Sequence, residues 1–305
     1  MTRKPGLISV VLGTTCEKRR AKSIRCAIAT VLCQEGVEVE LLLVVNGARF
    51  DPALLSELES EARIRVLRLE QASVSAARDL GWRESHGEYV SFLDDDDEFL
   101  PGCLKLRRDA LDQDPSVDYV ATNGYSDHRG PGQLWVQNVD EVKARPDIAA
   151  VREQWLPSCG GMFRVRSISN DFFTPVFDFH EWTWFNFQLL RAGKKVCFID
   201  EPTFHVHQTP GSASRLSTKE SVDADLFALR RMEAEATDDQ LPILRRKVGL
   251  SLHSSSDFYR ANGDVGLAWS LFFECLEYPG GWSHLFYVRH LLRTSITRLF
   301  GGRRG

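Results

Sequence analysis

Paired cysteines are absent from this sequence, which contains no C-x-x-C motif. Its seven cysteines are odd in number and lie far apart along the chain. This pattern argues against a disulfide framework and against a zinc site built from paired thiolates. We therefore expect reduced thiols, as in a cytosolic protein.

A strong excess of charge of one sign is also lacking. The formal net charge is −4 at pH 7, from 38 Lys and Arg against 42 Asp and Glu. Proteins that bind nucleic acid usually carry a clear positive excess. We therefore expect no nucleic-acid partner.

Long apolar runs are missing as well. No stretch reaches the ~18 apolar residues that a membrane-spanning helix needs. The run at residues 7–12 (LISVVL) is too short for the apolar region of a secretory signal and has no processing site after it. We expect a cytoplasmic protein that is soluble or, at most, peripheral at the inner face of a membrane.

What the sequence does contain is a regular alternation of strand and helix patterns. Nearly continuous apolar runs, typical of strands covered on both faces, alternate with segments whose apolar residues recur at helical spacing. The expected strands are residues 7–12, 41–45, 64–69 and 89–93, and the expected helices are 24–32, 54–62 and 73–85. This alternation predicts an α/β fold with a Rossmann-like, mostly parallel sheet flanked by helices.

The pattern loosens after Pro101 and becomes helical near residue 216. Between these points we expect a Gly- and Asp-rich loop at 123–133, helices at 104–111 and 181–191, and short strands at 117–122, 134–136, 162–165 and 195–199. Helical patterns follow in a run from Leu226 that continues through 241–253, and again at 264–277 and 283–300. The sequence thus predicts a small C-terminal helical extension over residues 216–305.

The strand expected at residues 89–93 runs directly into five consecutive carboxylates at 94–98. Like charges this close repel, so a fold keeps them together when they are solvated or when something positive compensates them. Open α/β sheets place their ligand crevice at the carboxyl ends of strands. We therefore predict a divalent cation here, and the alternative is an acidic surface turn.

Two sequence blocks carry a resemblance to a known family. One is A-I-A-T-V-L-C-Q at 27–34; the other joins A-R-D-L-G at 77–81 to G-E-Y-V-S-F-L-D-D-D-D at 87–97. On these motifs the chain resembles the family 2 glycosyltransferases of the GT-A fold, from residue 7 to about 215. The resemblance implies a nucleotide-sugar-binding half at 1–105 and an acceptor-binding half at 106–215.

The resemblance also implies how the donor is held. It makes Asp96 the main ligand of a Mn²⁺ or Mg²⁺ ion, with Asp94 in the same D-x-D pattern, and places Asp95 near the ribose. Carboxylates suit such hard ions, which can neutralise the charge on a leaving diphosphate. Arg78 matches a position that approaches the nucleotide, and an ion pair with the acidic run is the alternative.

The expected nucleotide site departs from the family pattern at two places. Residues 13–16 (GTTC) stand where the family commonly has Pro-x-Tyr-Asn, and residues 45–48 (VNGA) stand where it commonly has Asp-Asp or Asp-Asn before Gly-Ser. Asn46 keeps an acceptor oxygen and adds a donor, so it could still hydrogen-bond a base. We expect Thr14, Thr15 and Asn46 to line this site.

An inverting transfer needs a general base, and residues 177–182 (FDFHEW) resemble the family's acidic motif. Glu181 is the best match and Asp178 the second, although a carboxylate at a helix start is also favoured by the helix dipole. His205 and His207 fall on one face of a strand. The resemblance implies that they reach the metal, and a structural pair is the alternative.

The last expected helix combines apolar Leu285 and Leu292 with basic Arg289 and Arg293. Such a basic amphipathic helix predicts peripheral membrane contact, and the alternative is a helix docked on its own domain. Trp155, Trp182 and Trp184 are expected in the core, with stacking on a sugar as the alternative.

Together, these features predict a metal-dependent, inverting glycosyltransferase. It would move a sugar from a nucleotide-sugar donor to a saccharide or lipid-linked acceptor in cell-surface polysaccharide synthesis. The alternative is a degenerate relative that binds nucleotide or glycan without turnover. A sugar-nucleotide pyrophosphorylase is disfavoured because residues 13–17 (GTTCE) form no glycine-rich, basic phosphate loop.

Overall fold

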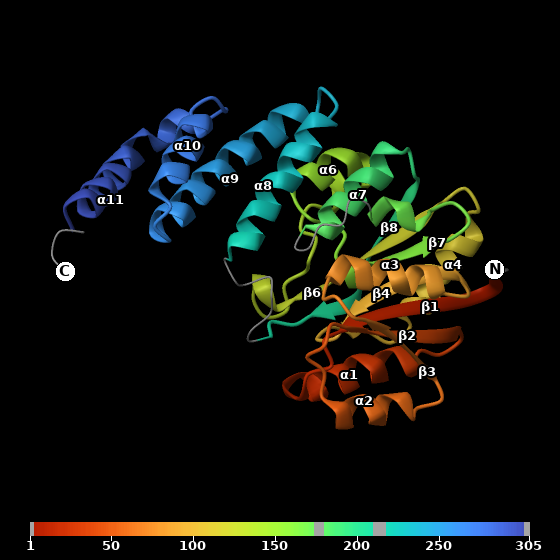
Figure 1. Cartoon of the computed structure of the whole chain (residues 1–305). Coiled ribbons are helices and arrows are strands. Elements are labelled where there is room, and N and C mark those ends of the chain that lie inside the picture. Colours follow the sequence, from red (N-terminus) through yellow and green to blue (C-terminus); the bar gives the residue numbers. More distant parts are fainter. Residues whose placement is uncertain (1–2, 174–179, 210–217, 302–305) are drawn as a thin grey trace. The chain divides into compact units, whose positions relative to one another are not determined.

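A computed structural model describes residues 3–173, 180–209 and 218–301 (Figure 1). The chain divides into two compact units, Met1–Ser212 and Ala213–Gly305. The first unit contains a mixed sheet with helices on its faces, and the second is helical.

The first unit is built on an eight-stranded sheet with the order β3-β2-β1-β4-β7-β6-β8-β5. The strands are β1 (Lys4–Thr14), β2 (Glu38–Asn46), β3 (Ile64–Leu69), β4 (Gly87–Asp94), β5 (Glu98–Phe99), β6 (Tyr119–Ser126), β7 (Gly161–Arg164) and β8 (Val196–Val206). The helices are α1 (Ala21–Leu32), α2 (Pro52–Glu59), α3 (Val74–Glu84), α4 (Cys103–Gln113), α5 (Val139–Ala144), α6 (Pro146–Arg152) and α7 (Glu181–Arg191). Short 3₁₀ turns are η1 (Lys18–Arg20), η2 (Asp127–Arg129), η3 (Ser158–Gly160) and η4 (Asn170–Phe173).

Strands β3, β2, β1 and β4 pair in parallel, as does β6 with β8. Among these strands, β7 pairs antiparallel with its neighbours β4 and β6, and β5 pairs antiparallel with β8 at the edge of the sheet. The expected α/β fold with a mostly parallel sheet, flanking helices and a C-terminal helical region is confirmed.

Alternate residues of the central strands enter two different cores. Ile8, Val10 and Leu12 of β1 pack with the apolar faces of α1, α2 and α4. Val11 of β1 belongs instead to the core formed with α3, α6 and α7. The strands are therefore buried on both faces, which is why their sequences are almost continuously apolar.

The starts of α2 and α3 are fixed by side chains that accept hydrogen bonds from free backbone N–H groups. The carboxylate of Asp51 accepts from the Leu54 N–H at 2.9 Å before α2, and the Ser73 hydroxyl accepts from the Ala76 N–H at 3.2 Å before α3. Both helices return the chain to the sheet, so these caps position the strand ends.

The expected loop at 123–133 begins four residues too early, and the expected strand at 134–136 is wrong. β6 continues through Asn123 to Ser126, and Leu134 makes only an isolated bridge to Tyr125. The side chain of Asn123 accepts from the Val136 N–H at 3.0 Å and donates to the Val136 carbonyl at 3.1 Å. The side-chain amide of Asn123 thus makes the two backbone hydrogen bonds to Val136 that a neighbouring strand would otherwise make. Strand β5 and helices α5 and α6 were not anticipated from the sequence.

The second unit consists of α8 (Lys219–Ala234), α9 (Leu241–Ala261), α10 (Val265–Cys275), the 3₁₀ turn η6 (Gly281–Tyr287) and α11 (Val288–Gly301). It has its own core, which includes Val248, Leu252, Phe272 and Leu291. No helix in the part of the chain that the structure describes is long and apolar enough to cross a membrane.

Helix α3 approaches β1 closely at Gly81, where a Cβ atom would lie 2.3 Å from Cγ1 of Val11. We expect Gly81→Ala to lower the free energy of unfolding by about 1–3 kcal/mol, because the buried strand cannot yield without repacking. Gly266→Ala in α10 is the matched control, since its Cβ would meet nothing nearer than 4.0 Å. The control should change stability by at most about 1 kcal/mol, in the stabilising direction. Urea unfolding measures both, and an undiminished stability for Gly81→Ala would contradict the close packing.

Candidate functional site

The strand order creates a switch point between β1 and β4. The chain passes from β1 to β2 and β3 on one side, then returns to β4 on the other side of β1. Such a point opens a crevice at the carboxyl ends of the strands. The register pairs Gly13 with Asp94 and Thr14 with Val45. The expected nucleotide residues and the acidic run therefore meet at one edge of the sheet.

Asp94 ends β4 and is the most accessible of the first carboxylates, with 39% of its side chain exposed. One of its oxygens accepts from Arg78 Nη2 at 2.8 Å, and the other accepts from the Ser158 hydroxyl at 2.8 Å. Asp94 is thus fixed in orientation by two donors from separate parts of the chain.

Asp95 points into the protein, where Arg20 compensates its charge. Its two oxygens accept from Arg20 Nε, at 2.8 Å, and Nη2, and one of them also accepts from the Thr14 hydroxyl. Nη2 of Arg20 also lies 3.1 Å from Asp96 Oδ2, and the Asp96 side chain is 12% exposed. Burial lowers the pKa of Arg20, but the two carboxylates raise it more, so the guanidinium stays charged.

Asp97 turns away from solvent and accepts the backbone N–H of His207 at 3.1 Å. Burial, together with the charges of Asp94 and Asp96, raises the pKa of its carboxyl well above the usual range. Glu98 follows in β5, and its Oε1 lies 3.2 Å from Nε2 of His207. Consecutive carboxylates in the run therefore have different environments and different charge partners.

Glu181, the first residue of α7, is joined to the acidic run through Arg78. The Arg78 guanidinium donates to Glu181 Oε1 as well as to Asp94 and lies 5.2 Å from the Trp182 ring centre. Arg78 is buried, and its two carboxylate partners raise its pKa despite that burial. The second oxygen of Glu181, Oε2, is buried and has no hydrogen-bond partner among the described residues.

Asn46 is buried at the end of β2, and its side-chain oxygen accepts the Ser73 N–H at 2.8 Å. The Asn46 oxygen, which we expected to accept a hydrogen bond from a nucleotide base, is therefore already bonded to Ser73, the residue that caps α3. The amide nitrogen is the group through which Asn46 would contact a ligand. Thr15 follows Thr14 at the end of β1 and is partly buried.

His205 and His207 lie together at the end of β8, with ring centres 4.1 Å apart. Asp127 of η2 joins them: its Oδ1 lies 2.8 Å from His205 Nε2 and its Oδ2 lies 3.3 Å from His207 Nδ1. One ligand atom from each residue falls within 4.8 Å of the others. Mixed imidazole and carboxylate donors fit Mn²⁺ or Zn²⁺ better than Mg²⁺.

The carboxylates at 94 and 96 form a second possible metal site, with hard oxygen donors only. Such donors fit Mg²⁺ or Mn²⁺, which need one or two carboxylates when phosphate and water complete the shell. Arg20 occupies one oxygen of Asp96, and both oxygens of Asp94 accept hydrogen bonds. The donor set therefore fits an ion that enters together with an anionic ligand.

Several residues of the site carry no motif signal. Arg20, Ser158 and Asp127 were not anticipated, because each comes from a separate segment that only the folded chain brings close. Asp178 lies outside the described residues. Trp155, Trp182 and Trp184 are buried, in agreement with a place in the core.

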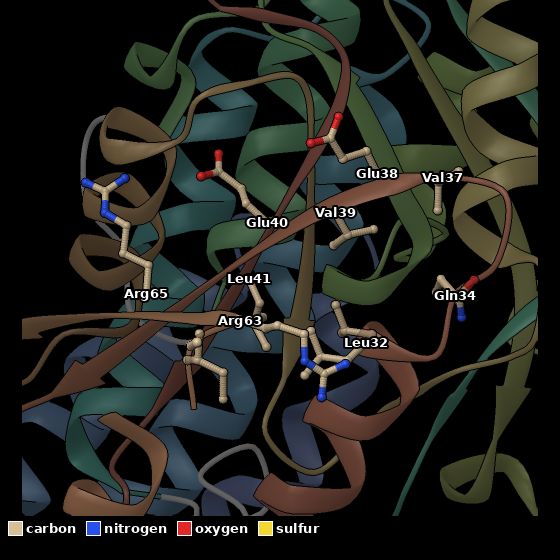
Figure 2. Close-up of a pocket in the computed structure, with 12 residues that line it drawn as sticks. Leu32, Gln34, Val37, Glu38, Val39, Glu40, Leu41, Arg63 and Arg65 are labelled. Carbon is tan, nitrogen blue, oxygen red and sulfur yellow. The ribbon is translucent and has the colours of Figure 1, made fainter. Parts of the chain in front are cut away.

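One cavity of the first unit lies elsewhere. About 490 Å³ opens beside the amino ends of β2 and β3, where Glu38, Glu40, Arg63 and Arg65 line it (Figure 2). The acidic run lies at the carboxyl end of the parallel strands, so this cavity is not the crevice of the switch point.

Comparison with protein families gives one matching model, described as glycosyl transferase family 2, over residues 9–173. By sequence the chain is similar to EpsJ of Bacillus subtilis (strain 168), an uncharacterized glycosyltransferase, with 24% identity over 213 residues. That alignment covers 65% of this chain and 61% of EpsJ. YibD of Escherichia coli K12, also an uncharacterized glycosyltransferase, is 25% identical over 43% of this chain and 38% of its own length. The chain thus spans about three fifths or less of these relatives.

By structure the chain is similar to S. aureus TarS 1–349 in complex with UDP-GlcNAc, with a TM-score of 0.60. The match covers 89% of this chain and 81% of TarS 1–349, at 14% sequence identity. The same TarS segment in complex with UDP matches with a TM-score of 0.54. At this identity the likeness establishes a shared fold.

The raised pKa of Asp97 makes a prediction for stability against pH. A carboxyl that holds its proton more tightly when folded adds stability below its unfolded pKa of about 4, and loses that contribution as pH rises through the folded pKa. Asp97→Asn keeps the acceptor for His207 and removes the charge. We expect it to stabilise the protein at pH 8 and to have little effect near pH 4.

Urea unfolding in EDTA at the two pH values measures this, with exposed Asp140→Asn as the control. An equal effect of Asp97→Asn at both pH values would show that Asp97 does not titrate abnormally.

Proposed function

The chain belongs to glycosyltransferase family 2, and on this premise we propose that it transfers a sugar, with inversion, from a nucleotide-sugar donor to a saccharide or lipid-linked acceptor. The observation that carries the proposal is the link from the acidic run through Arg78 to Glu181. Displacement at a sugar needs a held leaving group and a base in one site. The acceptor class implies a role in cell-surface glycan synthesis.

We propose that Asp96 holds a Mn²⁺ or Mg²⁺ ion, with Asp94 beside it. The ion, when bound, supplies positive charge to the diphosphate as it leaves. Hydrogen bonds from Arg78 and Ser158 already orient the side chain of Asp94, so this side chain would lose little conformational freedom when the ion binds. Asp95 acts through Thr14 and Arg20, because both of its oxygens are hydrogen-bonded to them.

His207 is the histidine that we propose reaches the ion or the diphosphate. Its backbone N–H is bonded to Asp97, which ties it to the acidic run. His205 would then help to orient His207, because both imidazole rings contact the carboxylate of Asp127.

Glu181 is the proposed general base. Arg78 holds Oε1, and the buried Oε2 is left as the atom that would accept the proton of the acceptor hydroxyl. Asp178, outside the described residues, remains the second candidate.

For the donor we propose a UDP-sugar first, because TarS, which shares the fold, has been crystallised with UDP-GlcNAc and with UDP. Thr14, Thr15 and Asn46 are the proposed contacts for the nucleotide. Since the Asn46 oxygen is engaged by Ser73, its amide nitrogen would donate to a carbonyl oxygen of the base.

One observation favours a second function, binding without turnover. Arg20 and Arg78 already form ion pairs with the carboxylates at 94–96, so part of their negative charge is compensated without an ion. A thermal-shift panel of UDP-, GDP-, dTDP- and CMP-sugars with and without Mn²⁺ identifies the donor. Metal-dependent hydrolysis of that donor would eliminate the alternative, and stabilisation without any turnover would support it.

We expect Asp96→Asn to weaken donor binding in Mn²⁺ by at least about tenfold, because the ion loses a charged ligand. Calorimetric titration of UDP-GlcNAc into the variant, with Mn²⁺ or with EDTA, measures the effect. Asp140→Asn, an exposed change of the same kind in α5, should bind as the wild type does. Equal donor affinity for all three proteins in Mn²⁺ would remove Asp96 from the metal site.

We expect Glu181→Gln to lower the rate of transfer by about 10²–10⁴-fold while donor affinity stays within about twofold. Exposed Glu35→Gln is the control. A variant that keeps the wild-type rate of transfer would show that another residue is the base.

A further inference from the structure

The C-terminal unit exposes large aromatic side chains in η6. Trp282 is 67% exposed and Phe286 is 84% exposed, and Leu285 between them is also exposed. Soluble surfaces normally carry single exposed apolar residues, whereas grouped ones mark a surface that contacts another apolar phase.

Helix α11 continues this exposed surface. Arg289, Leu292, Arg293 and Ile296 recur at i, i+3, i+4 and i+7, so they share one face of the helix, and all four are exposed. Leu291, on another face, is fully buried in the core of the unit. Nε1 of Trp269 donates a hydrogen bond to the Ser295 hydroxyl at 3.1 Å, which also holds the buried side of α11 against the unit. The helix is therefore docked on its own unit and still leaves an apolar and basic face uncovered among the described residues.

The charge of this segment is one-sided. Residues 278–305 contain five arginines and no Asp or Glu, although the whole chain has a net charge of −4. An extended basic segment attracts an anionic surface, and each basic residue adds to that attraction. The exposed aromatic side chains indicate that the partner is apolar as well as anionic.

We propose that η6 and α11 dock on the surface of an anionic lipid bilayer. Trp282 and Phe286 enter the interface between headgroups and acyl chains, where amphipathic aromatic side chains are favoured. Arg289 and Arg293 lie at the level of the lipid phosphates. Neither segment spans the bilayer, so binding is peripheral and reversible.

Vesicle co-sedimentation of the full chain tests the proposal without reference to catalysis. Phosphatidylcholine vesicles are compared with vesicles that contain about 30% phosphatidylglycerol, at low and at high salt. We expect binding to the anionic vesicles that weakens as salt rises, and little binding to the neutral ones.

Two variants remove the two halves of the surface. Trp282→Ser with Phe286→Ser, and Arg289→Glu with Arg293→Glu, should each weaken anionic-vesicle binding by at least about tenfold. Phe227→Ser changes an aromatic of α8 that is 56% exposed, and Arg63→Glu with Arg68→Glu changes exposed charges of the first unit. Both controls should stay within about twofold of the wild type.

Tryptophan fluorescence gives an independent reading. Anionic vesicles should shift the emission of the wild type to shorter wavelength, and Trp282→Phe should lose most of that shift. Binding that is equal for both vesicle types, or unchanged in both double variants, would overturn the proposal. So would light scattering that shows a dimer which the Trp282 and Phe286 variant dissociates, with no vesicle binding by the wild type.

Discussion

The repulsion among the carboxylates at 94–98 is the constraint that organises the site. The chain offsets each charge differently, with Arg78 beside Asp94, Arg20 beside Asp95 and Asp96, and burial of Asp97 with a raised pKa. Because these partners come from η1 and α3, the acidic run also fixes how the first helices meet the end of β4. Removing either arginine would leave a largely buried carboxylate, Asp95 or Glu181, without its cationic partner, which proteins tolerate poorly.

The same compensation connects the two sides of the proposed reaction. Arg78 spans from Asp94, on the donor side, to Glu181, at the start of α7, and its stacking on Trp182 ties it to the buried core. A rigid support of this kind would keep the proposed metal ligand and the proposed base at a fixed separation. The cost is that the arginines compete with an ion for the same oxygens. For this reason we expect the ion to enter with the diphosphate, whose negative charge changes the charge balance of the site.

Much of the fold of the first unit, and the position of the candidate site, could be predicted from the sequence. Apolar runs and helical spacing gave the order of the first strands and helices, and the position of the acidic run after such a strand located the crevice. The partners could not be predicted, because Arg20 and Asp127 lie in short turns with no motif, and many arginines could have filled the role. The oxygen of Asn46 and the side chain of Asn123 were also unpredictable, since both bond to backbone groups that only folding brings near.

The central claim is that the carboxylates at 94 and 96 bind an ion together with the donor diphosphate. Anomalous diffraction from crystals grown with UDP and Mn²⁺ tests it most directly, because the manganese position is measured without assumptions about activity. The account predicts a peak about 2.0–2.6 Å from an oxygen of Asp96, next to the diphosphate. A peak only among Asp127, His205 and His207, with Arg20 still paired to Asp96, would contradict it.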